Sequence, residues 1–496
     1  MTLWTENDWT FEKLEKVDNA IKKIADSYGL DYFPNQFDII SAEQMMDAYT
    51  SNGLPIMYHH WSFGKQFSQT EANYKRGRMG LAYEIVINSN PCISYLMEEN
   101  SMTMQALVIA HAAYGHNSFF KGNYLFKQWT SPDSIVDYLI FAKNYITKCE
   151  EKYGQEAVEE ILDACHALQH HGVDRYKKPK KLSIQKEKER QAARKEHQEK
   201  MIYDLWSTLP KQEEQKEKNQ KTLYFDEPQE NLLYFIEKTA PLLKDWQREI
   251  IRIVRKTAQY FYPQMQTKVM NEGWASFWHY TILNDMWEQG LISEGNMLEF
   301  LKSHTGVVFQ PAVDDKRYSG INPYYLGFNM FMDIKRMCEN PTEEDKKWFP
   351  NLVGKDWLEE IKYAMENFKD ESFIQQYLSP KLIREMRLFT LADNNNADHY
   401  RVNAIHDEQG YKQVRADLAA QYDISNMIPD IQITDFDMEG DRTLFLTHFQ
   451  KHHVPLDWDS TDDMLRHLHL LWGFDIALED LNTKTNKVTE AYLFPE

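Results

Sequence analysis

Glu272 and His279 lie seven residues apart in a stretch that is rich in aromatic side chains. An α-helix turns about 100° per residue, so seven steps place the carboxylate and the imidazole on one face. Burying these polar groups among Trp274, Phe277 and Trp278 is unfavourable unless they are paired or hold a metal ion. The spacing therefore makes Glu272 and His279 candidate metal ligands.

A second histidine pair lies upstream, where His111 and His116 enclose the sequence Ala-Ala-Tyr-Gly. Five steps on an α-helix turn about 500°, so the two imidazoles would diverge by about 140°. A π-type bulge closes that angle, and Gly115 is a natural point for the break. Two histidines with one glutamate form the ligand set of several zinc hydrolases.

We therefore predict one divalent cation, Zn²⁺, Fe²⁺ or Mn²⁺, held by His111, His116 and Glu272, with His279 as a candidate fourth ligand. A buried hydrogen-bonded network without a metal is the alternative that the sequence leaves open. A rival set joins Asp163 and His166 to Glu84, Glu249 and Glu272 as a two-metal carboxylate site, although one Asp-x-x-His pair is a weak signal.

The order of the elements resembles that of gluzincin-type metallopeptidases. A short strand is predicted at residues 83–88, the histidine-bearing helix follows, and a later helix supplies Glu272 in an Asn-Glu-Gly-Trp-Ala context. Those enzymes carry Glu directly after the first histidine, where this chain has Ala112. Either another carboxylate, such as Glu84, is the general base, or no peptidase chemistry occurs. If a metal-bound water attacks the substrate, Glu84 or Glu272 would orient that water, and Tyr114 or Lys268 would stabilise an oxyanion.

Composition limits the class of protein. The chain has 496 residues, too many for one compact core, and a net charge of −20, which argues against nucleic-acid and anionic-membrane binding. The four cysteines are scattered without a CxxC pair. Neither a signal peptide nor a run of 18 apolar residues is present, so we expect a cytoplasmic protein. Phosphate-binding loops and a GxSxG elbow are absent, which disfavours ATP hydrolysis and serine-esterase chemistry.

The pattern along the chain predicts a mainly α protein. A large helical domain with a short edge strand spans residues 1–176 and 223–385, interrupted by a charged linker or exposed helix at 177–222. Residues 386–496 alternate strand-like and helical stretches and predict a smaller α+β domain with an antiparallel sheet. The turn-rich residues 316–327 are interpreted as a loop that could cover a site.

Several motifs resemble the SpoVR family over nearly the whole chain: HWSFGK at 60–65, AHAAYGHNSFFKGN at 110–123, GVDRY at 172–176, YPQMQTKVMNEGWASFWH at 262–279 and NPYYLG at 322–327. The family is named for a role in forming the spore cortex. The resemblance therefore implies a role in sporulation, or in stationary-phase and starvation stress responses. It also implies a functional link to a PrkA-type serine kinase and a von Willebrand A-domain protein. It supplies no agreed catalytic residues.

Two hypotheses follow. The first is a cytoplasmic metal-dependent hydrolase with a His/His/Glu site, and the family's link to the cortex suggests cell-wall precursors or a peptide amide as substrate. The second is a non-catalytic adaptor that acts with the kinase and the A-domain protein. Ala112 after His111 favours the adaptor, whereas the aromatic-walled Glu and His stripe favours the hydrolase.

Overall fold

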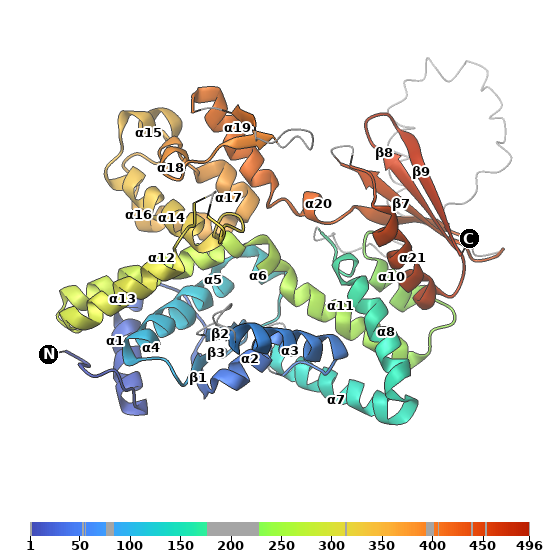
Figure 1. Cartoon of the computed structure of the whole chain (residues 1–496), viewed down its shortest axis with the longest axis horizontal. Helices are drawn as coiled ribbons and strands as arrows, with labels where there is room; N and C mark the ends of the chain where they lie inside the picture. Colours follow the sequence, from blue (N-terminus) through green and yellow to red (C-terminus); the bar gives the residue numbers. More distant parts are fainter. Residues whose placement is uncertain are drawn as a thin grey trace, which may run out of the picture. The chain divides into compact units, whose positions relative to one another are not determined.

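The structure, a computed structural model, describes residues 2–51, 54, 56–75, 84–175, 228–312, 315–392, 401–404, 406–437, 440–451 and 454–495, and gives only the backbone for 64, 70–75, 390–392 and 401–404. The chain forms two compact units, each built from two stretches of sequence (Figure 1). The first unit comprises Met1–His170 and Leu243–Pro429, and the second comprises His171–Leu242 and Asp430–Glu496. The predicted linker at 177–222 lies outside the described residues.

The first unit is mainly helical. Its N-terminal stretch contains α1 (Phe11–Ser27), β1 (Asn35–Ile40), α2 (Ala42–Thr50), α3 (Trp61–Lys75), β2 (Glu84–Ile87), β3 (Cys92–Met97), α4 (Met102–Ile109), the π-helix η1 (Ala110–His116), α5 (Asn117–Gly122), α6 (Tyr124–Trp129), α7 (Ile135–Tyr153), α8 (Gln155–Ala167) and, at its end, the 3₁₀ turn η2 (Gln169–His171).

The second stretch of this unit contains α11 (Asp245–Gln266), α12 (Lys268–Glu288), α13 (Glu294–Val307), α14 (Pro323–Glu339), α15 (Glu343–Trp348), α16 (Trp357–Asn367), α17 (Asp370–Tyr377), α18 (Pro380–Glu385), β4 (Thr390–Ala392), β5 (Arg401–Ala404), α19 (Glu408–Ala420) and α20 (Ile424–Met427). Strands β4 and β5 pair antiparallel with each other. No helix in the described parts of the chain is both long and apolar enough to cross a membrane.

A small sheet supports the histidine-bearing helix. Its strand order is β1-β3-β2, with β1 parallel and β2 antiparallel to β3. In this sheet β2 is therefore an edge strand, as the sequence predicted, and it contacts η1. Side chains alternate between the two faces of a strand, so Glu84 and Val86 share a face while Ile85 and Ile87 are buried on the other.

Helix α12 is the central element of the first unit, because it packs against α14, η1 and α1. Its Trp274, Phe277 and Trp278 side chains are fully buried in the main hydrophobic core. The N-terminus of α12 lacks a capping side chain of its own. The buried Asp370 carboxylate replaces it by accepting hydrogen bonds from the backbone N–H groups of Val269 and Met270, each at 2.8 Å.

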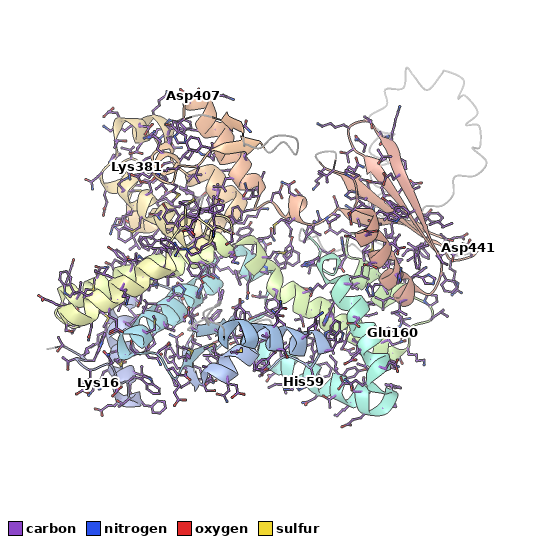
Figure 2. The ribbon with its side chains drawn as sticks, in the orientation of Figure 1. Lys16, His59, Glu160, Lys381, Asp407 and Asp441 are labelled. Atoms are coloured by element: carbon purple, nitrogen blue, oxygen red, sulfur yellow. The ribbon has the colours of Figure 1, made fainter. Side chains whose placement is uncertain are left out.

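The charged side chains of Glu12 and Lys16 lie on the exposed face of α1. Figure 2 shows Lys16 pointing away from α1, where it pairs with Glu12 at 2.7 Å. The opposite face of α1 buries Leu14, Val17 and Ile21 against the core, so the helix has the amphipathic pattern that its sequence predicts.

The second unit contains α10 (Leu232–Thr239), α21 (Trp458–Trp472) and the strands β6 (Ile431–Phe436), β7 (Leu444–Gln450), β8 (Ile476–Asn482) and β9 (Lys487–Phe494). The prediction of a mainly α chain with a smaller α+β part is confirmed. The sheet, with strand order β6-β7-β8-β9, is mixed and not purely antiparallel: β7 and β8 are parallel. The reason is that α21 connects these two strands, and a helical crossover returns the chain in the same direction.

Candidate metal centre

A π-helix brings His111 and His116 together. Across η1 the N–H of Asn117 donates to the carbonyl of Ala112, a bond five residues long instead of four. Residues five apart in the sequence therefore lie on the same face, one turn apart. The centroids of the two imidazole rings are 4.6 Å apart, and the ring planes are perpendicular, at 90°. The predicted bulge is thus confirmed.

Gly115 allows this π-helix to lie directly against α12. A Cβ atom on Gly115 would be 2.6 Å from the Cα atom of Ala275, which is closer than two carbon atoms can approach. The absence of a side chain brings the histidine-bearing backbone against the helix that carries Glu272. The Gly in the His-x₃-Gly-His sequence therefore has a packing role in addition to its place in the π-helix.

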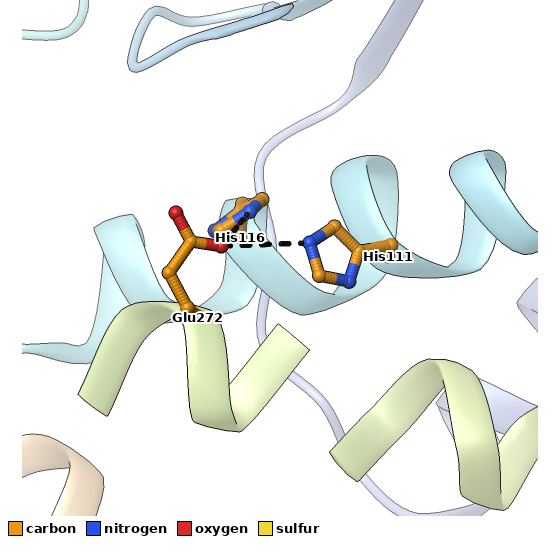
Figure 3. A group of neighbouring side chains, drawn as sticks. All are labelled: His111, His116 and Glu272. Atoms are coloured by element: carbon orange, nitrogen blue, oxygen red, sulfur yellow. Dashed lines mark ion pairs between the residues drawn. The ribbon is translucent and has the colours of Figure 1, made fainter. Parts of the chain in front are cut away.

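Glu272 extends from α12 toward both imidazoles (Figure 3). Its Oε2 atom lies 3.4 Å from Nε2 of His116 and 3.7 Å from Nε2 of His111. The three donor atoms lie within 4.8 Å of one another, in a set that comprises His111, His116 and Glu272. Donors bound to a tetrahedral zinc ion at 2.0–2.2 Å lie roughly 3.3 Å apart, so the spacing suits a metal.

The far nitrogen of each imidazole is held by a neighbour. Nδ1 of His116 lies 2.8 Å from Oδ1 of Asn271, to which it donates, and Nδ1 of His111 lies 2.9 Å from Nδ1 of His279. Both Nε2 atoms therefore face Glu272. Oε2 of Glu272 is buried, and the Nε2 atoms at 3.4 and 3.7 Å do not form well-aligned hydrogen bonds with it. A cation between the three atoms would satisfy this oxygen better than these long contacts do.

A cavity of about 350 Å³ opens beside the three residues. Glu84 enters it from β2, with Oε1 3.7 Å from Nε2 of His111. Tyr324, in the first turn of α14, stacks on the His111 ring at 16° with centroids 6.2 Å apart, and its hydroxyl interacts with Glu272. The apolar lining consists of Val86, Met104, Leu107, Phe120 and Val307.

The two carboxyl groups have opposite electrostatic environments. Burial raises the pKa of Glu84, and the imidazoles of His111 and His116 offset only part of that rise. Burial alone would also raise the pKa of Glu272, but the imidazoles of His116 and His111 lower it well below its ordinary value. Glu272 is therefore a persistent carboxylate suited to a cation, and Glu84 exchanges a proton more readily. The Glu272 carboxylate raises the pKa of Tyr324, which keeps the hydroxyl protonated.

Three of the predicted site residues have other surroundings. His279 lines the cavity, but its Nδ1 contacts His111 and its Nε2 lies 2.7 Å from Nδ1 of His304, so neither nitrogen joins the three converging donors. Tyr114 donates a hydrogen bond to Asp18 at 2.7 Å. Lys268 is exposed at the start of α12. Neither Tyr114 nor Lys268 lines the cavity.

The residues of the rival two-metal set are not brought together. Oδ1 of Asp163 lies 3.0 Å from Nε2 of His60, and Nε2 of His166 lies 2.6 Å from the hydroxyl of Tyr58. Glu249 pairs with Arg252 within α11. In the described parts of the chain the three-residue set at η1 and α12 is the one group with metal-ligand geometry.

Sequence reasoning did not assign roles to Tyr324, Asn271 or His304. Residues 316–327 were interpreted as a loop, whereas Asn322 caps α14 by accepting from the N–H of Tyr324 and Pro323 occupies the first turn. This Asn-Pro pair is a helix-start signal that could have identified Tyr324 as a residue at a helix N-terminus. Asn271 directly precedes Glu272, and only the distorted η1 geometry brings His116 to it.

Comparisons with known proteins agree with this architecture. A family profile described as SpoVR like protein matches residues 8–427, and one described as SpoVR-like C-terminal domain matches residues 429–483. The chain is 59% identical over 475 residues to the uncharacterized protein YcgB of Escherichia coli (strain K12), an alignment that covers 96% of this chain and 93% of that protein. No solved structure is significantly similar to the chain. Both profiles and the relative lead to one conclusion: the chain belongs to the SpoVR family.

Proposed function

We propose that the chain is a metal-dependent hydrolase in which His111, His116 and Glu272 hold one divalent cation. The observation that carries this proposal is the convergence of two Nε2 atoms and one carboxylate oxygen within 4.8 Å, with each far nitrogen already hydrogen-bonded. Imidazole and carboxylate donors suit zinc, and three protein ligands leave a coordination position for water, as in catalytic zinc sites. His111 and His116 are also buried, so they are not histidines that simply lie on the surface.

The surroundings of the proposed ligands support hydrolysis of an amide. The cation would supply a water of lowered pKa and polarise the scissile carbonyl. Glu84 takes the proton of the attacking water and passes it to the leaving amine, which suits a buried carboxyl group whose pKa is raised. The hydroxyl of Tyr324 donates a hydrogen bond to the oxyanion that forms on the substrate. Glu84 thus takes the role of the glutamate that Ala112 replaces.

Elemental analysis tests the metal, and a set of variants tests its ligands. Purified wild type is expected to bind one equivalent of metal, and Glu272→Gln and His111→Ala are expected to lose it while remaining folded by circular dichroism. Glu249→Gln, on α11, is the matched control and should retain the metal, because Glu249 pairs with Arg252 and not with the site. A folded wild type that binds no divalent metal at equilibrium would overturn the proposal.

A second candidate function is a non-catalytic adaptor acting with a PrkA-type serine kinase and a von Willebrand A-domain protein. The observation in its favour is Ala112, a buried methyl group where H-E-x-x-H enzymes carry their general base. Stoichiometric co-elution of the purified chain with the two proteins, unchanged in Glu272→Gln, would support the adaptor. Failure of co-elution at micromolar concentrations would count against it.

A further inference from the structure

Three buried imidazoles form an unbroken chain that leads away from the proposed metal. His111 in η1 contacts His279 in α12 through their Nδ1 atoms at 2.9 Å, and Nε2 of His279 lies 2.7 Å from Nδ1 of His304 in α13. His111 is 2%, His279 0% and His304 5% exposed, so the chain ends at the most accessible of its three rings. The role of His279 and His304 is not accounted for by the three-ligand site.

The rings of His279 and His304 are neutral in these surroundings. His304 packs beside Tyr280 and Phe328, with centroids 4.9 and 4.8 Å away, and His279 meets the edge of Phe300. Burial among aromatic rings makes the charged form of either imidazole unfavourable. A neutral imidazole has one N–H, so one of its nitrogens donates and the other accepts.

Two hydrogen bonds in series then allow two arrangements of protons. In the first, His304 donates from Nδ1 to Nε2 of His279, His279 donates from Nδ1 to His111, and His111 carries its proton on Nε2. In the second, His111 donates from Nδ1, His279 donates from Nε2, and His304 carries its proton on Nε2. When each ring has one proton, a change at His111 requires a change at both other rings.

The proposed metal distinguishes the two arrangements. Without a cation, the carboxylates of Glu84 and Glu272, each 3.7 Å from Nε2 of His111, favour a proton on that nitrogen and therefore the first arrangement. A cation needs the Nε2 lone pair and therefore the second arrangement. We propose that His111, His279 and His304 are a histidine chain that changes tautomer as a unit when a divalent metal binds, which makes His279 and His304 positioning residues. This inference rests on the proposed function.

The proton balance of the change is closed. One proton leaves Nε2 of His111 for solvent at the cavity. The Nδ1 proton of His279 moves to Nδ1 of His111, and the Nδ1 proton of His304 moves to Nε2 of His279. Nε2 of His304 takes one proton from solvent, so each ring stays neutral and the protein's charge from these rings does not change. Partners that hold the far nitrogen of a metal ligand fix its tautomer and raise its basicity.

Nitrogen NMR of the whole protein tests the histidine chain directly. In protein labelled with ¹⁵N in the histidine rings, two-bond ¹H–¹⁵N correlations report which nitrogen carries the proton, and His279→Gln and His304→Phe assign the signals. On titration with zinc, His279 is expected to change from an Nδ1–H to an Nε2–H tautomer, and His304 likewise. Zinc binding that leaves the tautomers of His279 and His304 unchanged would overturn the proposed histidine chain but not the proposed metal site. Failure to bind zinc would overturn the proposed function instead.

Zinc affinity of two matched variants provides a second measurement. His304→Phe keeps an aromatic ring but removes the acceptor of His279, so it is expected to bind one equivalent of zinc about 10–100-fold more weakly, the usual effect of losing an outer-shell partner. His166→Phe removes a half-buried histidine that contacts Tyr58 and should bind zinc as the wild type does. Equal zinc affinity of wild type and folded His304→Phe would contradict the proposed positioning role. If His304→Phe does not fold, the wild-type NMR titration decides.

Discussion

Gly273 and Gly327 touch where α12 crosses α14. A Cβ atom on Gly273 would lie 2.4 Å from the Cα atom of Gly327, and one on Gly327 would lie 2.0 Å from the carbonyl oxygen of Val269. The two backbones are thus in direct contact, and neither position has room for a methyl group. Because Glu272 precedes one glycine and Tyr324 lies one turn before the other, this contact helps bring both side chains to one cavity.

Replacing Gly273 by alanine is expected to separate the two helices. The added methyl group would meet backbone atoms that cannot rotate away, so we expect a loss of roughly 1–3 kcal/mol in the free energy of unfolding and weaker metal binding. Urea unfolding and zinc titration measure both effects. Gly295→Ala in α13 is the control, because a Cβ atom there meets no atom within 4 Å. Equal effects of the two substitutions would contradict the role of the close contact.

Glu84→Gln separates catalysis from metal binding. The residue lies outside the three-ligand set, so we expect metal content to remain at one equivalent, whereas the hydrolytic rate falls about 10²–10⁴-fold with the loss of a general base. Metal content and turnover are measured on the same preparation. Loss of the metal from folded Glu84→Gln would show instead that Glu84 is a ligand.

Tyr324→Phe is expected to lower kcat more than it changes metal affinity. The phenyl ring preserves the stacking on His111, whereas the hydroxyl that would donate to the oxyanion is removed. Loss of one such donor lowers kcat by about 10²–10³-fold. Tyr325→Phe, one residue further on and outside the cavity lining, is the control. An unchanged kcat in Tyr324→Phe would exclude this role of the hydroxyl.

Asp345 makes stability depend on acid pH. Arg336 of α14 donates to both carboxylate oxygens at 2.6 and 3.0 Å. Burial alone would raise the pKa of Asp345, but hydrogen bonds from Arg336 and Thr342 lower it to about 2, below its ordinary value of 3.8. Because the folded-state pKa is the lower one, the stabilisation is present above pH 3.8 and is lost as the pH falls through about 2.

Asp345→Asn should therefore destabilise the chain by roughly 1.5–3 kcal/mol at neutral pH, and the difference from wild type should shrink as the pH falls toward 2. Chemical unfolding at several pH values measures this difference. Glu12→Gln, which removes the exposed pair with Lys16, should leave stability nearly unchanged, because solvent screens that pair. A difference for Asp345→Asn that stays constant between neutral pH and pH 2 would contradict the assignment.

The sequence was sufficient to predict the elements that carry the ligands. Helical spacing placed Glu272 on a helix, and the five-residue separation of His111 and His116 required a wider turn than an α-helix provides, which η1 confirms. These conclusions depend on local geometry, which residue spacing determines directly.

The partners of these residues depend on tertiary packing and could not be predicted in the same way. His279 shares a helix face with Glu272, yet α13 brings His304 to its Nε2 and η1 brings His111 to its Nδ1. Tyr324 reaches the cavity because α12 and α14 meet at two glycines. The mixed sheet of the second unit likewise follows from a crossover helix, α21, that local strand patterns do not reveal.

X-ray absorption at the zinc edge tests the central claim most directly. In protein that contains one equivalent of zinc, we predict nitrogen and oxygen ligands at about 2.0–2.2 Å with the outer-shell scattering of two imidazoles, whereas folded His116→Ala is expected to lose the zinc. Sulfur ligands, outer-shell scattering that lacks two imidazoles, or wild-type zinc scattering retained in His116→Ala would contradict a site built from His111, His116 and Glu272.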